Sequence, residues 1–377
     1  MNTIKINHAE KIKLLFTINS LRGGGAEKVL VNLVNRLNPQ KYNITLLVLF
    51  GDGVNKQFLH SNIKVVRLFK KAPFGFVHIA KLFPASWLHW LFIKEKYDIE
   101  VSYLQGVCTR IVGGAPKNQS TVAWIHNFDR PDRLFRSPKE MHSILENSSL
   151  VACVSKHTKE QVDRACNGQA ISKVLYNTQD VDTILRFSKE PVEILMREKG
   201  LKFVAIGTLY DVKGYLRLLK SLYKLKLEKF NFKMYFVGDG PQRKELEEFV
   251  KTHGMREYVT FFGFDKNPYK YLAKADLFIC SSYTEGFSGT VSEATILGIP
   301  TLTTECAGMK EILGEQNEYG IVVENSDKGL EEGIRNILDN PDILKHYKEA
   351  VRKRSDFFKP EKTVSEVETM FDNLVRK

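Results

Sequence analysis

Residues 281–311 read SSYTEGFSGTVSEATILGIPTLTTECAGMKE and directly follow LFIC, a short apolar run that predicts a strand. Two carboxylates, Glu285 and Glu293, stand on either side of the glycine-containing turn GFSGT, which opens a helix. Exposed backbone N–H groups at a helix start, with the positive end of the helix dipole behind them, favour phosphate. Carboxylates accept hydrogen bonds from sugar hydroxyls. The segment therefore has the chemistry of a nucleotide-sugar pocket.

The same residues also allow a purely structural interpretation. Thr290 and Glu293 stand three residues apart and suit a capping box at the helix start. Glu285 suits an ordinary solvated loop. A single E-x7-E pair is a short motif that often occurs by chance, so the rest of the chain has to decide.

The whole chain alternates between apolar runs and helical patterns, beginning with KIKLLFTIN, a glycine turn and AEKVLVNLVNRL. Continuous apolar runs between helices indicate parallel strands covered on both faces. Strands are expected over residues 11–19, 44–50, 63–68, 98–104, 120–125 and 150–155, and over residues 202–207, 233–238, 259–264, 277–282, 300–305 and 320–325. We therefore predict an α/β protein with two doubly wound Rossmann-like domains facing each other across a cleft. The expected domains are 1–185 and 186–358, and residues 359–377 are expected to form a C-terminal helix that returns to the first domain.

The excess positive charge lies in one half of the chain. Residues 1–180 contain 25 Lys and Arg against 13 Asp and Glu, whereas residues 181–377 contain 31 of each. We expect the N-terminal half to meet an anionic partner, such as a membrane surface, a phosphorylated acceptor or nucleic acid. There are 5 cysteines without a C-x-x-C pair, no apolar run of the roughly 18 residues that span a bilayer, and no signal-peptide pattern. These features predict a cytoplasmic protein with reduced thiols.

Two further loops with phosphate-binding chemistry follow predicted strands. LRGGGAEK carries three glycines directly before a helix, and GTLYDVKGY places Lys213 at another helix start, where its charge can reach a diphosphate. Each loop also suits a structural turn. The first does not match G-x-G-x-x-G, which argues against an NAD-dependent dehydrogenase.

Eight motifs occur in order along the chain: LRGGGAEKVL, WIHN, GTLYDVKGY, FVGDGP, VTFFGF, NPYKYLAKADLF, EGFSGTVSEA and GIPTLTTECAGMKEIL. This combination resembles the retaining GT-B glycosyltransferases that carry the E-x7-E signature. It is most similar to bacterial enzymes that extend lipopolysaccharide cores, capsules and exopolysaccharides. The resemblance covers nearly the whole chain and is strongest over residues 202–324. It implies a hexosyltransferase that acts with retention on a nucleotide diphosphate donor, with uridine as the expected base.

The resemblance also implies roles for individual residues. Glu293 would accept hydrogen bonds from the ribose, Glu285 would face the donor sugar near the reacting centre, and Lys213 would neutralise the leaving diphosphate. His126 in WIHN would align the donor sugar, which makes it a third expected catalytic residue beside Glu285 and Lys213. The other expected donor-binding positions are Gly24, Gly25, Thr208, Phe264, Gly286, Phe287, Ser288, Gly289 and Thr290.

One position departs from the family pattern. An arginine that contacts the diphosphate usually follows the glycine matched by Gly207, and this chain has Thr208 instead. A hydroxyl is a weaker partner for phosphate than a guanidinium, so we expect either lower donor affinity or a substitute cation, with Arg22 as a candidate. No plausible metal-binding D-x-D follows a predicted strand, so we expect no metal and no cofactor beyond the nucleotide-sugar substrate.

The acceptor is expected to be lipid-linked or a glycan, with the enzyme peripheral on the inner face of the cytoplasmic membrane. Residues 70–96, KKAPFGFVHIAKLFPASWLHWLFIKEK, have aromatic and aliphatic residues at helical spacing with lysines around them. They suit an interfacial helix on anionic lipid or amphipathic helices packed on the first sheet, and we favour packing for the aromatic residues. Arg130, Arg133 and Arg136 are candidates to face a pyrophosphate-linked acceptor.

Two other functions remain open. A sugar-nucleotide epimerase of the same architecture would convert the donor without an acceptor. A basic nucleic-acid-binding protein would use the charge of the N-terminal half, but the chain has no recognised nucleic-acid module, so no nucleic-acid partner is expected.

Overall fold

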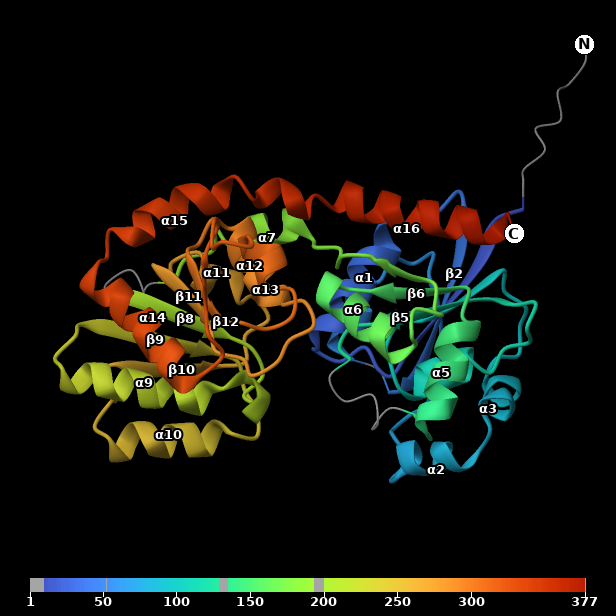
Figure 1. The fold of residues 1–377 in the computed structure, drawn as a ribbon, viewed down its shortest axis with the longest axis horizontal. Coiled ribbons are helices and arrows are strands. Elements are labelled where there is room, and N and C mark those ends of the chain that lie inside the picture. Colours follow the sequence, from blue (N-terminus) through green and yellow to red (C-terminus); the bar gives the residue numbers. More distant parts are fainter. Residues whose placement is uncertain (1–9, 52, 129–134, 193–199, 377) are drawn as a thin grey trace, which may run out of the picture. The chain divides into compact units, whose positions relative to one another are not determined.

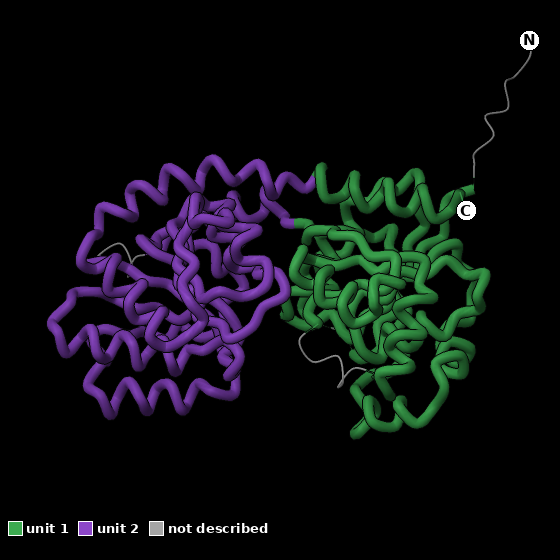
Figure 2. Tube along the Cα trace, viewed as in Figure 1, with its two compact units in different colours: residues 1–178, 361–377 green, residues 179–360 purple. Residues whose placement is uncertain are grey.

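The computed structural model describes residues 10–51, 53–128, 135–192 and 200–376 (Figure 1). The chain forms two compact units (Figure 2): unit 1 comprises residues 1–178 and 361–377, and unit 2 comprises residues 179–360. The division falls a few residues before the boundary expected at residue 185. Each unit is a parallel sheet with helices on its faces, so the prediction of an α/β protein with two Rossmann-like domains is confirmed.

Unit 1 contains a seven-stranded parallel sheet in the order β3-β2-β1-β4-β5-β6-β7. Its strands are β1 (Ile12–Ile18), β2 (Tyr42–Phe50), β3 (Lys64–Phe69), β4 (Ile99–Ser102), β5 (Ser120–Ile125), β6 (Leu150–Cys153) and β7 (Ser172–Val174). The helical segments are α1 (Gly25–Arg36), η1 (Val54–Phe58), α2 (Phe76–Leu82), α3 (Ala85–Phe92), α4 (Val107–Val112), α5 (Pro138–Asn147), α6 (Lys156–Ala165) and α16 (Pro360–Val375). The sequence predicted six of these strands and missed β7, which is too short to show a pattern.

Helix α16 packs on unit 1 although it ends the chain. The Phe371 ring lies 6.0 Å from that of Phe16 in β1 and 5.9 Å from that of Tyr42 in β2, measured between centroids. Asp372 forms an ion pair with Lys41 at 2.6 Å. The helix therefore covers an apolar part of the first sheet, as a C-terminal segment that returns to the first domain must do.

Unit 2 contains a six-stranded parallel sheet in the order β10-β9-β8-β11-β12-β13. Its strands are β8 (Leu201–Ile206), β9 (Phe232–Val237), β10 (Val259–Gly263), β11 (Leu277–Cys280), β12 (Thr301–Thr304) and β13 (Ile321–Val323). The helical segments are α7 (Val181–Phe187), η3 (Asp211–Lys213), α9 (Tyr215–Leu227), α10 (Arg243–Thr252), α11 (Tyr269–Leu272), α12 (Gly289–Ile296), α13 (Met309–Leu313), α14 (Asp327–Asp339), α15 (Ile343–Arg352) and η4 (Ser355–Phe358). All six strands predicted for this half are present.

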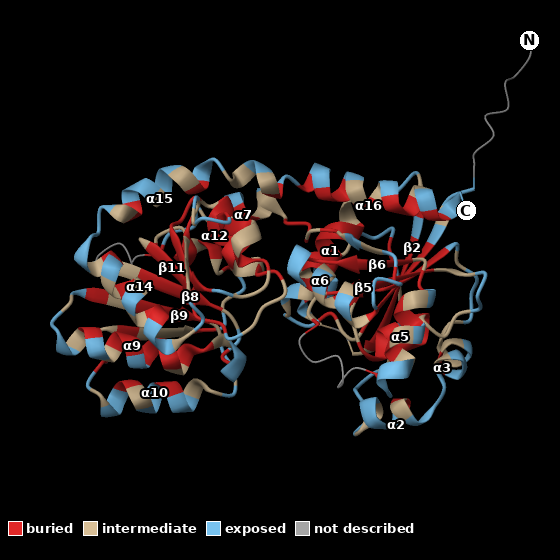
Figure 3. Cartoon of the chain, viewed as in Figure 1, coloured by how far each residue is buried: buried red, intermediate tan, exposed pale blue. Residues whose placement is uncertain are grey.

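The central strands of both sheets are buried on both faces, as Figure 3 shows. In unit 2, Phe203 and Phe236 pack with the inner faces of α9 and α14 in one cluster, while Val291 of α12 is buried on the other side. This two-sided burial explains the continuous apolar runs in the sequence. Cys108, Cys153, Cys166, Cys280 and Cys306 are all free thiols.

Residues 70–96 correct one expectation. They form α2 and α3, and Phe76 packs against Phe50 and Phe69 as preferred. The preference for packing was wrong for Ile79, Phe83, Trp87 and Trp90, which are exposed. The helices are short and meet the sheet through one narrow stripe each, which leaves the rest of their apolar residues outside. Within the described ranges, no helix has the length and apolar character needed to cross a membrane.

Candidate active site

The predicted residues of unit 2 gather where the chain changes direction across the sheet. From β8 the chain continues outward through β9 and β10, and from β11 it continues in the opposite direction through β12 and β13. Ligands of open α/β sheets bind at the carboxyl ends of the strands at such a switch point. The 3-10 segment with Lys213 follows β8, and the loop with Glu285 follows β11.

Lys213 and Glu285 form an ion pair. Lys213 Nζ donates to Glu285 Oε1 at 2.7 Å, and Ser282 Oγ donates to the same oxygen at 2.7 Å. Both side chains are mostly buried. The two residues, expected to act separately, therefore meet in this structure, and Ser282 is a further member of the site that the sequence reasoning missed.

The charge of Lys213 is secure at neutral pH. Burial acts to lower the pKa of Lys213, but the attraction of the Glu285 carboxylate, with smaller contributions from Cys280 and Cys306, outweighs burial and raises the pKa above its usual value of 10.5. An ammonium group is thus available at the switch point to meet an anionic ligand.

Backbone contacts tie the Lys213 segment to the Glu285 loop. Ser281 Oγ donates to the Lys213 carbonyl at 2.9 Å, and Tyr283 N donates to the Val212 carbonyl at 2.8 Å. Gly214 has φ 65°, and a Cβ there would collide with the Ser281 carbonyl oxygen. Only glycine allows this close approach, which explains the glycine after Lys213.

Arg217 of α9 holds the same loop through hydrogen bonds to its backbone. None of the sequence motifs had indicated a role for this arginine. Its guanidinium is buried and donates to the Ser281 carbonyl at 2.9 and 2.6 Å and to the Ser282 carbonyl at 2.7 Å. It also lies 3.9 Å from the centroid of the Tyr283 ring. The available signal was an arginine within the apolar run YLRLLKSL, at a position of α9 that faces inward.

The start of α12 is capped by Ser288, whose Oγ accepts from Val291 N at 3.4 Å. The alternative of a capping box between Thr290 and Glu293 is therefore wrong, because Thr290 already lies inside the helix. Apart from its chain neighbours and the backbone of its own helix, no described atom lies within 4 Å of the place that a Cβ of Gly289 would take. Other elements therefore leave space beside Gly289, and the first N–H groups of a helix are those that favour an anion.

Glu293 is buried and accepts a hydrogen bond from the Tyr269 hydroxyl at 3.3 Å. Tyr269 lies in the NPYKYL motif, whose presence was noted in the sequence without a role. In the turn before α12, Phe287 is buried, and a Cβ at Gly308 would approach its ring to 2.9 Å. Packing against the loop after β12 therefore holds Gly286 and Phe287 in place.

Thr208 and Phe264 also follow strands of unit 2, and both are exposed. Thr208 lies two residues after the end of β8, and its carbonyl accepts from Tyr210 N at 2.8 Å. Phe264 directly follows β10, where the Gly263 carbonyl accepts from Gly238 N at 2.8 Å. Both positions lie at the carboxyl edge of the sheet, where the sequence placed them.

In unit 1, Gly24 and Gly25 form the start of α1, with Gly24 as the N-cap residue. The Glu27 carboxylate folds back against this start, so that a Cβ at Gly24 would collide with it. Burial raises the pKa of Glu27, while its own backbone N–H and Ser20 oppose this effect. The anion site predicted at this helix start therefore holds a carboxylate of the same chain. Arg22, just before it, is exposed.

His126 follows β5 at the carboxyl edge of the first sheet. Its backbone N–H donates to Gln105 Oε1 at 3.2 Å, and its ring lies 5.1 Å from that of Tyr103. Its Nε2 is buried without a hydrogen-bond partner among the described residues. Burial lowers the pKa of His126 to about 4, against a smaller opposing effect of the Tyr103 backbone, so the ring is neutral at physiological pH. Arg130 and Arg133 lie outside the described residues, and Arg136 is exposed.

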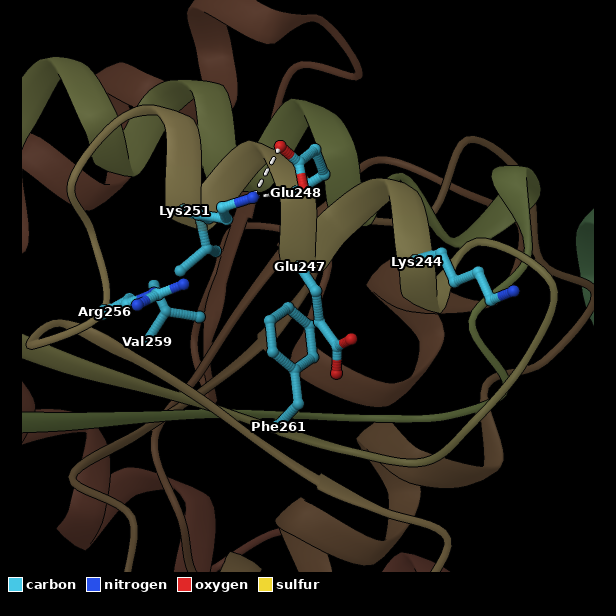
Figure 4. A pocket seen from close by; sticks show the side chains of 8 residues that line it. Lys244, Glu247, Glu248, Lys251, Arg256, Val259 and Phe261 are labelled. Carbon is cyan, nitrogen blue, oxygen red and sulfur yellow. Dashed lines mark hydrogen bonds and ion pairs between the residues drawn. The ribbon is translucent and has the colours of Figure 1, made fainter.

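A separate cavity of about 590 Å³ lies between α10 and the edge strand β10 (Figure 4). Charged side chains of α10, among them Lys244, Glu247 and Lys251, line it together with Phe261. Glu248 and Lys251 pair with each other at 3.5 Å. None of the predicted donor residues lines this cavity, so it is not the candidate active site.

Comparison with known families gives the site its context. Residues 187–354, nearly the whole of unit 2, match the model of the family described as glycosyl transferases group 1. An N-acetylgalactosamine-N,N'-diacetylbacillosaminyl-diphospho-undecaprenol 4-alpha-N-acetylgalactosaminyltransferase of Campylobacter jejuni is 25% identical over 362 residues, covering 92% of this chain and 95% of that protein. The lipopolysaccharide core biosynthesis glycosyltransferase LpsD of Rhizobium meliloti is 22% identical over 325 residues, covering 84% of this chain and 86% of LpsD.

Solved structures share the architecture. HepE of Anabaena in complex with UDP has a TM-score of 0.76 at 18% identity, with 96% of this chain and all of that chain covered. WaaG, a glycosyltransferase involved in lipopolysaccharide biosynthesis, has a TM-score of 0.71 at 16% identity, with 93% and 98% covered. The two Rossmann-like units therefore have the GT-B architecture. The family model matches unit 2 only, while the likeness to these solved structures covers the fold of nearly the whole chain.

Proposed function

We propose that the protein is a retaining, metal-independent glycosyltransferase that transfers a hexose-type sugar from a UDP-linked donor to a lipid-linked glycan. The observation that carries this proposal is the ion pair between Lys213, in the segment after β8, and Glu285, in the loop between β11 and α12. The pair lies at the switch point of the sheet. A cation, a carboxylate and an open helix start together offer the contacts that a sugar diphosphate needs.

Lys213 and Glu285 would change partners when the donor binds. In the free protein Lys213 Nζ bonds to Glu285 Oε1, and Ser282 Oγ bonds to the same oxygen. A diphosphate carries more negative charge than a carboxylate and would attract Lys213. Glu285 would then keep its bond from Ser282 and accept hydrogen bonds from the sugar hydroxyls, so that one ion pair is exchanged for donor contacts.

Glu293 has the surroundings of a ribose acceptor. It is buried, already accepts from the Tyr269 hydroxyl, and lies one helix turn inside α12, whose first backbone N–H groups would hold phosphate. In unit 1, the unpaired Nε2 of neutral His126 is the group that we propose to contact the donor sugar. The exposed Thr208 offers only a hydroxyl to the diphosphate, so Lys213 would supply most of the charge stabilisation.

In the transfer itself, the bond between the anomeric carbon and the departing diphosphate oxygen breaks. The acceptor oxygen forms its bond to the anomeric carbon on the same face, and its proton passes to the departing phosphate oxygen. Catalysis would then consist of positioning and charge stabilisation by Lys213 and the α12 N-terminus.

The name of the Campylobacter relative suggests the class of acceptor, a glycan on diphospho-undecaprenol. We propose an acceptor of this polyprenyl-diphosphate class and, with it, an enzyme that acts peripherally on the inner face of the cytoplasmic membrane. The relatives reported above are glycosyltransferases, which leaves the epimerase alternative without support.

Thermal unfolding with UDP, GDP, ADP, CMP and NAD tests the proposal. UDP alone is expected to raise the melting temperature, because a ligand at about 100 times its Kd stabilises the folded state by about 2.7 kcal/mol. Glu293→Ala should abolish the shift, whereas Tyr269→Phe removes the same internal hydrogen bond and should keep it. Transfer with UDP-α-hexoses should give α-linked product by NMR and persist in EDTA. A shift with NAD alone would refute the proposal.

A further inference from the structure

Exposed apolar side chains of unit 1 concentrate on α2, α3 and the turn before them. Seven large apolar residues are exposed there: Phe74, Val77, Ile79, Leu82, Phe83, Trp87 and Trp90. We call this set the α2–α3 surface, and Figure 3 shows the two helices at an edge of the unit with exposed faces. Single exposed apolar residues are ordinary, but a contiguous set marks an interaction surface.

The two helices are attached to the unit through their other faces. Ala80 and Leu88 are buried in one apolar cluster with Ile111 of α4. The Phe76 ring packs edge-on against Phe69 of β3, with 5.2 Å between centroids. These contacts fix which face of each helix points toward the sheet. The apolar residues on the opposite face are therefore exposed.

Arg110 locks this arrangement. It is fully buried and donates to the Ala80 carbonyl at 2.6 Å and to the Phe83 carbonyl at 2.7 Å. Its guanidinium also forms a bidentate pair with Glu140, at 2.9 and 2.8 Å. Because one buried cation joins the end of α2 and the turn before α3 to α5, the α2–α3 surface is a rigid feature of the fold.

Positive charge surrounds the α2–α3 surface. Exposed lysines flank it on both sides in sequence: Lys70, Lys71, Lys94 and Lys96. Lys94 Nζ lies 4.6 Å from the centroid of the Trp90 ring. Glu95, the only acid between residues 70 and 96, is paired with Lys64 at 2.6 Å. An apolar face with unneutralised lysines beside it is complementary to a partner that has an apolar interior and negative charge at its surface.

We propose that the α2–α3 surface docks on an anionic lipid bilayer, with Trp87 and Trp90 at the level of the headgroups. The inference rests on the proposed function for its lipid-linked acceptor, which such docking would bring to the enzyme. Helices of 7 and 8 residues are too short to span a bilayer, so they would lie within its interface. A second copy of the chain fits less well, because a symmetric contact would set the same lysines against each other.

Tryptophan fluorescence gives a direct test. The chain has 3 tryptophans, and Trp124 is buried in the core of unit 1, so quenching by brominated lipid reports Trp87 and Trp90. Brominated phosphatidylglycerol vesicles are expected to quench the emission, and brominated phosphatidylcholine vesicles much less, with the difference declining as salt rises. Vesicle binding without quenching would overturn the proposal, as would a concentration-dependent dimer that shields both tryptophans from aqueous quenchers.

Matched variants separate this surface from the active site. Trp87→Ser/Trp90→Ser should weaken flotation with phosphatidylglycerol vesicles at least about tenfold, the change that ~1.4 kcal/mol produces. The control Ile171→Ser/Leu227→Ser removes two apolar residues that are equally exposed elsewhere and should float like the wild type. Both variants should keep the melting shift with UDP. Equal flotation of the tryptophan variant and the wild type would refute the docking surface, whereas a missing UDP shift in a vesicle-binding wild type would refute only the proposed function.

Discussion

Arg217→Met tests whether a buried guanidinium holds the loop that carries Glu285. The methionine keeps the apolar stem within α9 but removes every hydrogen bond to the loop. The Ser282 carbonyl keeps a donor, because Thr304 Oγ1 bonds to it at 2.6 Å. The Ser281 carbonyl loses both bonds from Arg217, at 2.9 and 2.6 Å. The perturbation is therefore centred on one buried carbonyl just before the loop that carries Glu285.

The expected cost follows from these contacts. A buried carbonyl that loses its donors costs about 1–3 kcal/mol. Loss of the contact between Arg217 and the Tyr283 ring adds about 0.5–1 kcal/mol, since Tyr283 is half exposed. Relief from burying a charge offsets part of this sum. We expect a loss of about 2 kcal/mol, or about 4–8 °C in the melting temperature of a unit of this size.

Calorimetry and donor kinetics on the same preparation test whether Arg217 positions the loop that carries Glu285. Arg217→Met should lower the melting temperature and also lower kcat/KM for the donor, because Ser282 and Glu285 lose their support. Arg335→Met removes a partly exposed arginine of the same unit, paired with Glu228 and Glu331, and should leave both the melting temperature and the donor kinetics nearly unchanged, because solvent screens such a pair. A variant at Arg217 that melts and turns over like the wild type would show that the guanidinium has no positioning role.

Three other substitutions probe neighbouring features. Lys213→Met should lower donor turnover about a hundredfold or more, as loss of one charge-stabilising group does, with the melting temperature as control for folding. The folded-state pKa of His126, about 4, lies below its usual value of 6.5, so stability should fall by up to about 3 kcal/mol as pH drops from 6.5 to 4. Urea unfolding across this range should show that slope, and His126→Phe should flatten it. Gly214→Ala should cost more than about 2 kcal/mol in melting experiments, because it adds a collision to backbone strain, whereas Gly168→Ala at φ 73° meets no nearby atom and should cost about 1 kcal/mol.

The sequence was sufficient for the sheets and for the edge on which the site lies. Buried parallel strands leave continuous apolar runs, and β8 and β11 were therefore visible as KFVAIG and LFICSS. The loops after such strands must lie at one edge of the sheet, which placed Lys213 and Glu285 on the same edge but did not predict that they form an ion pair. By contrast, β7 has 3 residues and no apolar run, so its position depends on pairing with β6 rather than on its own pattern.

Residues that support the candidate site indirectly had no sequence pattern comparable to the apolar runs that predicted the strands. Ser282 and Arg217 support Glu285 and its loop, and Tyr269 supports Glu293, yet each lies in a segment whose pattern reports only a strand end or a helix face. Their roles depend on distances between elements that are far apart in the chain. The exposure of Trp87 and Trp90 escaped prediction for the same reason, since helical spacing shows which residues share a face but not whether that face is covered.

The Lys213–Glu285 pair changes how the two residues should be understood. Separately, each is an ordinary ligand-binding group, but in the pair each neutralises the other until an anion arrives. In the free protein the attraction between the two charges therefore offsets the cost of desolvating them at the switch point. A donor diphosphate that takes Lys213 also releases Glu285 for the sugar, so contacts to the two ends of the donor would form together. UDP alone would break the pair and leave Glu285 with its bond from Ser282, whereas the complete sugar nucleotide would also give Glu285 the sugar hydroxyls as partners.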